Sequence, residues 1–317
     1  MPFCCCCLDL SELQALSRPL PNFPLFSMSI LISLALFFIM VSLGLNLPSL
    51  QFDLLKHRPA LIVRVLLATC VVLPLAALLL LRTPLGQGLS PAITTAVMLM
   101  AICPSAPMIA LKSKKLAENP ELATRLQFWS ACAAIISVPL WVTQLPLEAG
   151  ETIWSVSARD VAFQVFTVQL IPLLVGVSLR RWCAEWSERW NPVIQKGASI
   201  LLLVLLALIL IVALPKVTPM LIANLRGALL MFILTWVGIG LGYVVAGDNH
   251  DERSTLPLVL SMRNPGLALL IIQGMAPNAI DLKAAVVGYV VVTAVGTAPF
   301  MKWRQANASQ DAITGEG

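Results

Sequence analysis

The sequence predicts an all-α integral membrane protein of about nine transmembrane helices. Three observations lead to this prediction: the chain is 58% hydrophobic and only 12% charged, its apolar residues fall into long segments, and its basic residues alternate between the loops. A soluble domain carries roughly 25% charged residues, so this composition cannot cover a globular surface with polar groups. Lipid is therefore the expected solvent for most of the 317 residues, and each spanning helix needs about 20 mostly apolar residues.

Nine apolar segments are separated by charged residues, proline or glycine, which end helices or mark loops. The segments cover residues 24–46, 59–82, 89–111, 121–146, 160–180, 196–214, 220–246, 254–275 and 282–302. Pro74, Pro139 and Pro172 lie inside the second, fourth and fifth segments, and we expect each of them only to kink its helix. The third and eighth segments differ, because each contains a cluster of helix-breaking residues near its middle.

An acidic stretch after the fourth segment divides the chain into a half with four helices and a half with five. We expect residues 24–146 to form a first repeat, 147–159 an external linker and 160–303 a second repeat. Two repeats of five helices, with the first helix of the first repeat missing, would sit inverted relative to one another, which is a common plan for transporters. Residues 1–23 are expected to be a disordered N-terminal segment, and residues 304–317 a cytoplasmic tail.

The distribution of lysine and arginine predicts the orientation in the membrane. Thirteen fall on one side of the alternating loops: Lys56, Arg58, Lys112, Lys114, Lys115, Arg125, Arg180, Arg181, Arg189, Lys196, Arg253, Lys302 and Arg304. Five fall on the other side: Arg18, Arg82, Arg159, Lys216 and Lys283. Because cytoplasmic loops are enriched in basic residues, we predict a multi-pass protein of the cell (inner) membrane with its N-terminus outside and its C-terminus in the cytoplasm.

The cysteines and histidines indicate neither a disulfide framework nor a metal site. Four of the eight cysteines are the contiguous run Cys4–Cys7, and His57 and His250 are the two histidines. We therefore expect no cofactor and no metal. Acylation, metal binding and a disordered N-terminus stay open for Cys4–Cys7.

The third and eighth segments are the candidate binding site. The third is interrupted at Cys103-Pro104-Ser105-Ala106-Pro107 and the eighth at Arg263-Asn264-Pro265-Gly266. Proline removes a backbone donor, and in hydrocarbon the freed carbonyls must find partners or line a wet cavity. Two interrupted helices in matching positions of two halves point to a transporter's substrate site, here around residues 103–110 and 262–268. The alternative is that these prolines only kink their helices.

Arg263 gives this site a positive charge. A guanidinium at the centre of a bilayer costs at least about 2.5–3.5 kcal/mol, and no Asp or Glu lies inside the nine segments away from their ends. Freed carbonyls or an anionic substrate are left as its partners. Asn264 can donate and accept hydrogen bonds, and half-helix N-termini favour anions. We therefore expect the substrate to be a small organic anion.

At these residues the chain resembles the bile acid:sodium symporter family. The resemblance rests on three groups of residues: Gly44-Leu45-Asn46-Leu47 with Asp53, Pro59 and Pro74; Cys103-Pro104, similar to the family's Cys-Pro-Gly-Gly; and Met262-Arg263-Asn264 with Gly266-Leu267-Ala268, similar to its Gly-Met-Gln-Asn-x-Gly-Leu-Ala. The resemblance implies two inverted five-helix repeats, a panel and a core domain, and broken fourth and ninth helices that cross. It also implies a nine-helix member that lacks the first helix.

The resemblance implies sodium-site residues from which this chain departs. The family's sodium-binding Glu is Val259 here and its sodium-site Gln is Arg263, while Thr69 and Gln127 stand at or near other ligand positions. Since the usual ligands are mostly absent, sodium remains possible but its coupling is doubtful, and Arg263 would take the place of a cation. The candidate substrate-binding residues are Arg263, Asn264, Pro104, Ser105, Pro107, Pro265, Thr69 and Gln127.

These observations favour a secondary transporter that works by alternating access. Enzyme motifs such as His-Glu-x-x-His, Gly-x-Ser-x-Gly and the P-loop are absent, so we expect no enzyme, and the basic residues mark a membrane face rather than a nucleic-acid site. Two alternatives stay open: a passive channel or facilitator of the same fold, and a membrane sensor or assembly protein whose helices pack within or between chains through Gly238-x-x-x-Gly242. The expected partners are the small organic anion and the lipid bilayer; the oligomeric state is open.

Overall fold

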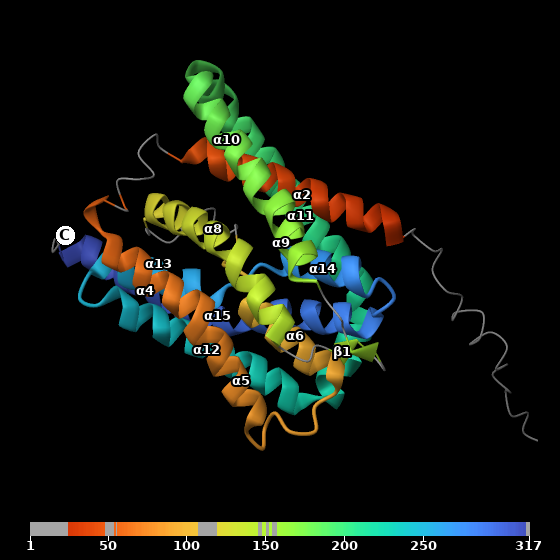
Figure 1. Ribbon diagram of the computed structural model, residues 1–317. Helices are drawn as coiled ribbons and strands as arrows, with labels where there is room; N and C mark the ends of the chain where they lie inside the picture. The colour runs from red at the N-terminus through yellow and green to blue at the C-terminus, as the bar shows by residue number, and fades with distance from the viewer. Residues whose placement is uncertain are drawn as a thin grey trace, which may run out of the picture.

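The computed structural model of the chain is almost entirely helical (Figure 1). It describes residues 25–47, 54, 56–106, 119–144, 148–149, 152–153 and 157–314. Segment 1–23 and Pro107 lie outside these ranges, so the expectations placed on them stay predictions. Inside the predicted linker, the two-residue strands β1 (Glu148–Ala149) and β2 (Thr152–Ile153) form an antiparallel pair.

Each half of the chain contains one long helix with a π-helical turn in its middle. The first half consists of α2 (Leu25–Asn46), α4 (Pro59–Leu67), the π-turn η1 (Ala68–Val72), α5 (Leu73–Arg82), α6 (Pro91–Ile102) and α8 (Pro120–Gln144). The second half consists of α9 (Ala158–Val165), the π-turn η2 (Phe166–Leu170), α10 (Ile171–Trp182), α11 (Ala184–Ala223), α12 (Leu225–Ala246), α13 (His250–Ser261), α14 (Pro265–Met275) and α15 (Ile280–Thr314). The helices α4, η1 and α5 are continuous, as are α9, η2 and α10.

Within the described residues, five helices are long and apolar enough to cross a membrane. They are Pro59–Arg82, Glu121–Gln144, Ala158–Trp182, Leu225–Ala246 and Ile280–Ala306. Shorter apolar helices cover Ser33–Asn46, Pro91–Ile102 and Pro265–Met275. The prediction of a helical multi-pass membrane protein is confirmed in this form, while the count of nine spans and the inverted repeat stay predictions.

Two helices are longer than the apolar segments predicted from the sequence. The sixth segment covers 196–214, whereas α11 begins at Ala184 and continues through Pro215 and Pro219 to Ala223. The ninth segment ends at 302, whereas α15 continues to Thr314; the cytoplasmic location of the tail from residue 304 stays a prediction. A proline removes a single backbone donor, and α11 also packs against α2 and α15.

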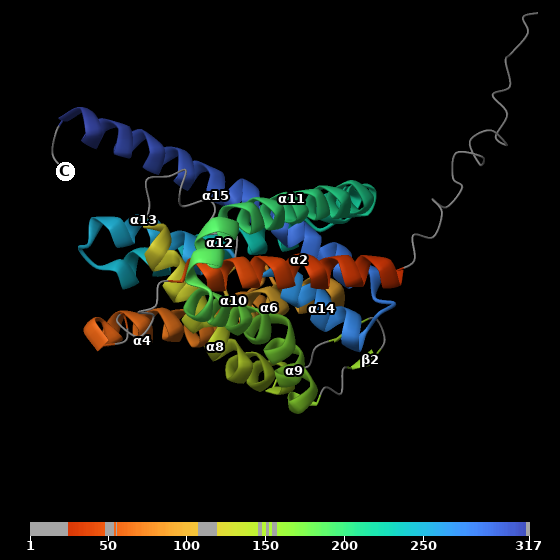
Figure 2. The same ribbon diagram turned by 90° about the horizontal axis from the view of Figure 1, so that it is seen from above.

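The helices pack in two groups. One group contains α2, α10 and α11, and the other contains the helix α4–η1–α5 together with α6, α12, α13 and α15 (Figures 1 and 2). The helix α9, which continues into α10 of the first group, packs against α8, which contacts α4 and α13 of the second group. The two groups also meet where α11 packs against α15. Both groups expose large apolar side chains, such as Phe38 and Val204 in the first and Leu79 and Val244 in the second, as expected for helices that face lipid.

Glycine allows the closest helix contacts in both groups. A Cβ atom on Gly44 of α2 would lie 2.3 Å from the carbonyl oxygen of Leu173 in α10, and one on Gly176 would lie 2.2 Å from that of Val41. On α12, Gly238 and Gly242 lie against the backbone of α13 in the same way. The Gly238-x-x-x-Gly242 spacing therefore packs two helices within the chain.

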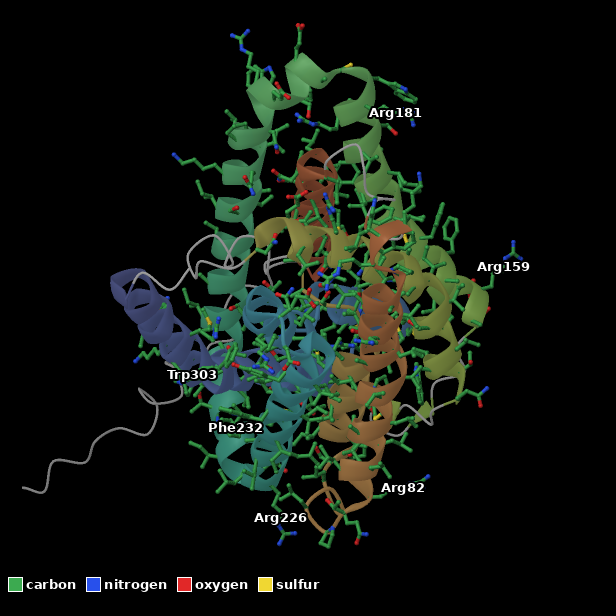
Figure 3. The ribbon with its side chains drawn as sticks, turned by 90° about the vertical axis from the view of Figure 1, so that its left-hand side faces the viewer. Arg82, Arg159, Arg181, Arg226, Phe232 and Trp303 are labelled. Carbon is green, nitrogen blue, oxygen red and sulfur yellow. The ribbon has the colours of Figure 1, made fainter. Side chains whose placement is uncertain are left out.

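Exposed arginines mark opposite ends of the helix bundle. Figure 3 shows Arg82 and Arg226 at one end and Arg181 at the other. The alternation of basic residues along the sequence predicts Arg82 outside and Arg181 in the cytoplasm, and this orientation stays a prediction.

Candidate functional site

The two interrupted segments cross and pair through their backbones. α6 ends at Ile102 and α13 ends at Ser261. The two segments that follow these helices run antiparallel to each other and form a single β-bridge between Ser105 and Arg263. The Ala106 N–H donates to the Met262 carbonyl at 2.8 Å, and the Asn264 N–H donates to the Pro104 carbonyl at 2.9 Å. These bonds satisfy backbone groups that have left their helices in an environment without water.

Arg263 is the centre of this crossing and is almost completely buried, with 3% of its surface exposed. Its Nε donates to the Met100 carbonyl at 3.2 Å, and its Nη2 donates to the Ala101 carbonyl at 2.6 Å. In a continuous helix the N–H of residue 104 would donate to the carbonyl of residue 100, but Pro104 has no N–H. The guanidinium therefore bonds to carbonyls that the break in α6 leaves free, at the helix end that carries the negative pole of the dipole.

A third carbonyl reaches Arg263 from the π-turn η1. The Nη2 atom donates to the Thr69 carbonyl at 3.2 Å. Within η1 the Leu73 N–H donates to the Ala68 carbonyl, so it is not available to Thr69, and the next residue, Pro74, has no N–H. Pro74 was expected only to kink its helix; it also frees an acceptor for the guanidinium.

The neighbouring carbonyl of this turn, that of Cys70, accepts a hydrogen bond of 2.7 Å from the Nε1 atom of Trp141 in α8. Its helical partner would have been the N–H of residue 74, which Pro74 lacks. The carbonyls freed by the π-turn are thus both satisfied by side chains from other segments.

Gln127 of α8 holds the first broken segment in place. Its Oε1 accepts from the Ser105 hydroxyl at 2.6 Å, and its Nε2 donates to the Ser105 carbonyl at 2.7 Å. Both residues are buried. The structure therefore brings Gln127 to the crossing as a support for Ser105.

Asn264 and Pro265 begin the second half of the broken helix. The Asn264 Oδ1 accepts from the Leu267 N–H at 3.2 Å and caps α14, while Pro265 occupies the first helical position, where its missing N–H costs nothing. Gly266 follows, and a Cβ atom there would lie 2.9 Å from the side chain of Leu36. Glycine thus lets α2 pack directly on the crossing.

Three buried polar atoms at the crossing have no hydrogen-bond partner among the described residues: Nη1 of Arg263, Nδ2 of Asn264 and Oγ1 of Thr69. Two of the three are donors only. Tyr289 of α15 is also fully buried and close enough to Arg263 for the two groups to interact electrostatically. Sequence reasoning missed Tyr289, although a tyrosine in the middle of an apolar span was a usable signal because its hydroxyl needs a polar neighbour.

The structure thus brings together seven of the eight predicted site residues; the eighth, Pro107, lies outside the described ranges. No carboxylate contributes to the electrostatic surroundings of Arg263 among the described residues. No group of three or more His, Cys, Asp or Glu side chains in the described part of the chain is arranged to hold a metal ion. Within the described residues, the crossing therefore offers a ligand hydrogen-bond donors and main-chain carbonyls.

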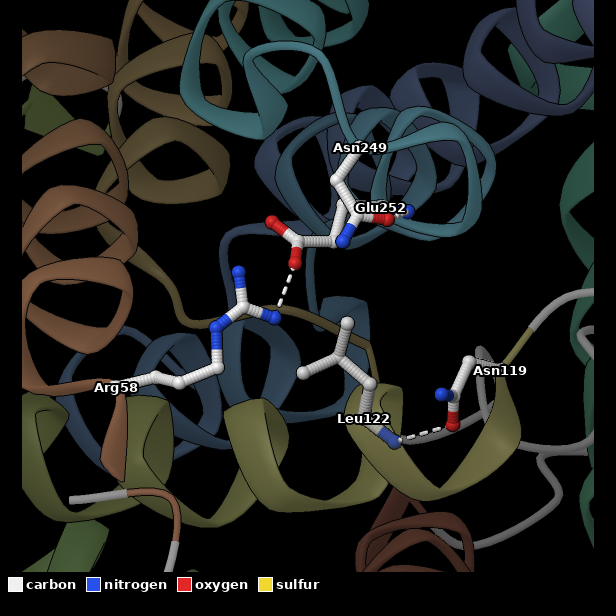
Figure 4. A network of polar contacts seen from close by, with 5 residues as sticks. All are labelled: Arg58, Asn119, Leu122, Asn249 and Glu252. Carbon is white, nitrogen blue, oxygen red and sulfur yellow. Dashed lines mark hydrogen bonds and ion pairs between the residues drawn. The ribbon is translucent and has the colours of Figure 1, made fainter. Parts of the chain in front are cut away.

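A second polar network lies where α4, α8 and α13 begin (Figure 4). Arg58 forms an ion pair with Glu252, whose side chain is buried. The Oδ1 of Asn249 accepts from the Glu252 N–H at 3.3 Å, and the Oδ1 of Asn119 accepts from the Leu122 N–H at 2.9 Å. These contacts fix the beginnings of the helices.

Comparison with known families agrees with this geometry. The model of the sodium bile acid symporter family matches residues 33–218, which is more than half of the chain. The chain belongs to the sodium bile acid symporter family. The match includes Thr69, Pro104, Ser105 and Gln127 and ends before Arg263.

One relative is the probable sodium/metabolite cotransporter BASS2, chloroplastic, of Oryza sativa subsp. japonica. It is 24% identical over 279 residues, which cover 86% of this chain and 64% of the relative. The chain thus spans about 64% of the length of this relative. Members of the symporter family are transporters, so the family assignment confirms the expectation of a transport family rather than an enzyme family.

Proposed function

We propose that this symporter-family protein is a secondary transporter of a small organic anion, with its substrate site at the crossing. The observation that carries the proposal is the pair of buried donors, Nη1 of Arg263 and Nδ2 of Asn264, which have no partner among the described residues. An isolated buried donor costs about 1–3 kcal/mol, and more if it is charged. An anionic oxygen that accepts a hydrogen bond from either donor would remove the cost of that donor.

The surroundings of these donors favour an anion over a neutral ligand. The three carbonyls bonded to Arg263 are dipoles and leave its full positive charge in place. Asn264 and Pro265 start α14, so the positive end of that helix dipole faces the same region. A carboxylate or a sulfonate of moderate size matches both features.

The grouping of the helices supports alternating access as the proposed mechanism. Substrate sites formed by broken helices are exposed to either side of a membrane when one bundle rocks against another. The group of α2, α10 and α11 meets the crossing through Leu36 and Gly266, so movement between the groups would change access to Arg263. We further propose that the protein lies in the cell inner membrane with its C-terminus in the cytoplasm.

Sodium enters this proposal because the family and the rice relative are named for it. Both the family and the rice protein are described with sodium, which supports a sodium-coupled transporter of small organic substrates. Arg263 raises a separate question about where a cation would bind.

The variant Asn264→Asp tests the substrate site. Asp caps a helix as well as Asn, so α14 should form, but a carboxylate replaces the donor and neutralises Arg263. Purified protein would be screened by thermal shift with benzoate, glutarate and methanesulfonate, with and without sodium. We expect at least one anion to stabilise the wild type, and its affinity to fall by at least about tenfold in the variant, because like charges in a desolvated site cost more than the roughly 1.4 kcal/mol that tenfold represents.

The matched control is Asn224→Asp, the same substitution at the start of α12, away from the crossing. The control should bind the anion like the wild type. Counterflow of the stabilising anion in proteoliposomes then separates a secondary transporter from a passive channel. Equal anion binding by Asn264→Asp and the wild type would refute the proposed site, and flux without counterflow would favour the passive facilitator.

A further inference from the structure

We infer that Arg263 occupies, as a tethered cation, a position that would otherwise bind a free monovalent cation such as sodium. Three main-chain oxygens from two separate segments converge on the guanidinium: those of Thr69, Met100 and Ala101. Together they form what we call the carbonyl cage. Unwound backbone carbonyls and half-helix C-terminal ends are the groups that coordinate sodium in broken-helix transporters.

The carbonyl cage exists independently of Arg263. Pro104 removes the N–H that would reach Met100, and Pro74 follows the π-turn that leaves the Thr69 carbonyl free. If the guanidinium were removed, three buried acceptors would be left without a donor, next to the negative end of the α6 dipole. The Oγ1 of Thr69, which is buried and has no partner among the described residues, would add a fourth oxygen.

A free sodium ion does not fit this position in the wild type. The N–O distances of 2.6 to 3.2 Å place the guanidinium directly against the three oxygens, so it fills the space between them and its positive charge repels a second cation. The charge is also fixed to the chain, so it cannot be released on one side of the membrane. Any coupling to sodium must therefore use another part of the protein.

This inference does not depend on the identity of the substrate, because it concerns the cage alone. It predicts that a neutral residue at position 263 converts the cage into a cation site. The test uses the full-length variants Arg263→Ala and Arg263→Gln, purified in detergent. Their thermal unfolding would be measured in sodium chloride, choline chloride and dilute guanidinium chloride at constant ionic strength.

We expect both neutral variants to unfold at a higher temperature in sodium or dilute guanidinium than in choline, by on the order of 5 °C, because a ligand that binds only the folded state raises its stability. The wild type should show a smaller response to sodium, whatever sodium does elsewhere in the chain. Arg263→Lys keeps a tethered cation and should respond like the wild type. Arg226→Ala removes an exposed arginine and should also respond like the wild type.

Neutral variants that respond to sodium no more than the wild type would overturn the inference. The same conclusion would follow if both neutral variants failed to fold in sodium buffer while Arg263→Lys folded, because the inferred cage should accept the free ion. Failure of the anion screen leaves this test unchanged, since its readout contains no substrate.

Discussion

Replacement of Gln127 by leucine should loosen the crossing by a measurable amount. Gln127 makes two hydrogen bonds to Ser105, and both residues are buried. A typical hydrogen bond contributes about 1 kcal/mol net, and a buried group left without a partner costs about 1–3 kcal/mol. Leucine removes both bonds and leaves the Ser105 carbonyl and hydroxyl unsatisfied, so we expect the free energy of unfolding to fall by about 3 kcal/mol.

The pair can be separated by a double-mutant cycle. Ser105→Ala removes the hydroxyl bond but keeps the bond from Gln127 Nε2 to the carbonyl of residue 105, so it should cost about 1 kcal/mol. The double variant should cost less than the sum of the two single variants by about 1 kcal/mol, because the hydroxyl bond is lost only once.

The assay is thermal unfolding in detergent, followed by intrinsic fluorescence. A loss of about 3 kcal/mol lowers the midpoint by roughly 6 °C in a chain of this size or somewhat smaller. Gln164→Leu is the control, since Gln164 makes a single bond of 2.7 Å to the Leu270 carbonyl and should cost about 1 kcal/mol. Strictly additive costs at Ser105 and Gln127, or a Gln127→Leu variant as stable as the wild type, would refute the reasoning.

Two further predictions concern helix packing and the second polar network. Gly44→Ala and Gly176→Ala each place a methyl group within about 2.3 Å of a backbone oxygen of the facing helix, so each should lower stability by roughly 1–3 kcal/mol. Gly240→Ala, on the open side of α12, should instead be neutral or stabilising by up to about 1 kcal/mol in the same thermal assay; equal losses in all three would be inconsistent with close α2–α10 packing. Arg58→Met leaves the buried Glu252 carboxylate unpaired and should lower the free energy of unfolding by about 1–3 kcal/mol, less than for a fully buried pair, because water around the half-exposed Arg58 already screens part of the attraction. Adding Glu252→Gln to Arg58→Met should restore part of the lost free energy of unfolding, measured by denaturant titration. A double variant less stable than Arg58→Met would show that the unpaired charge is not the cause.

The sequence by itself determined that lipid surrounds most of the chain and where the two helices are interrupted. Apolar segments of spanning length can only be stable in lipid, and clustered prolines at 104 and 265 remove the donors that a continuous helix needs. The absence of acidic residues inside the segments also predicted that Arg263 would turn to carbonyls or to an anion, and the structure shows three carbonyls. Each of these inferences uses only local composition and local hydrogen bonding.

Helix length was less predictable than the position of the breaks. The apolar segment 196–214 stops before Pro215, whereas α11, which packs against α2 and α15, continues through Pro215 and Pro219 to Ala223. The π-turn η1 also left no pattern in the sequence, since a displaced backbone bond such as that from Leu73 to Ala68 changes no side-chain spacing that hydropathy could reveal.

Only the tertiary structure decided which groups meet at the crossing. Arg263 is separated by 194 residues from Thr69 and by 163 from Met100, and Gln127 by 22 from Ser105. Main-chain carbonyls are present at every residue and carry no signature in the sequence, so their selection depends on how distant helices cross. The sequence therefore shows the charge of the site, which Arg263 carries, whereas helix packing decides which carbonyls contact this residue.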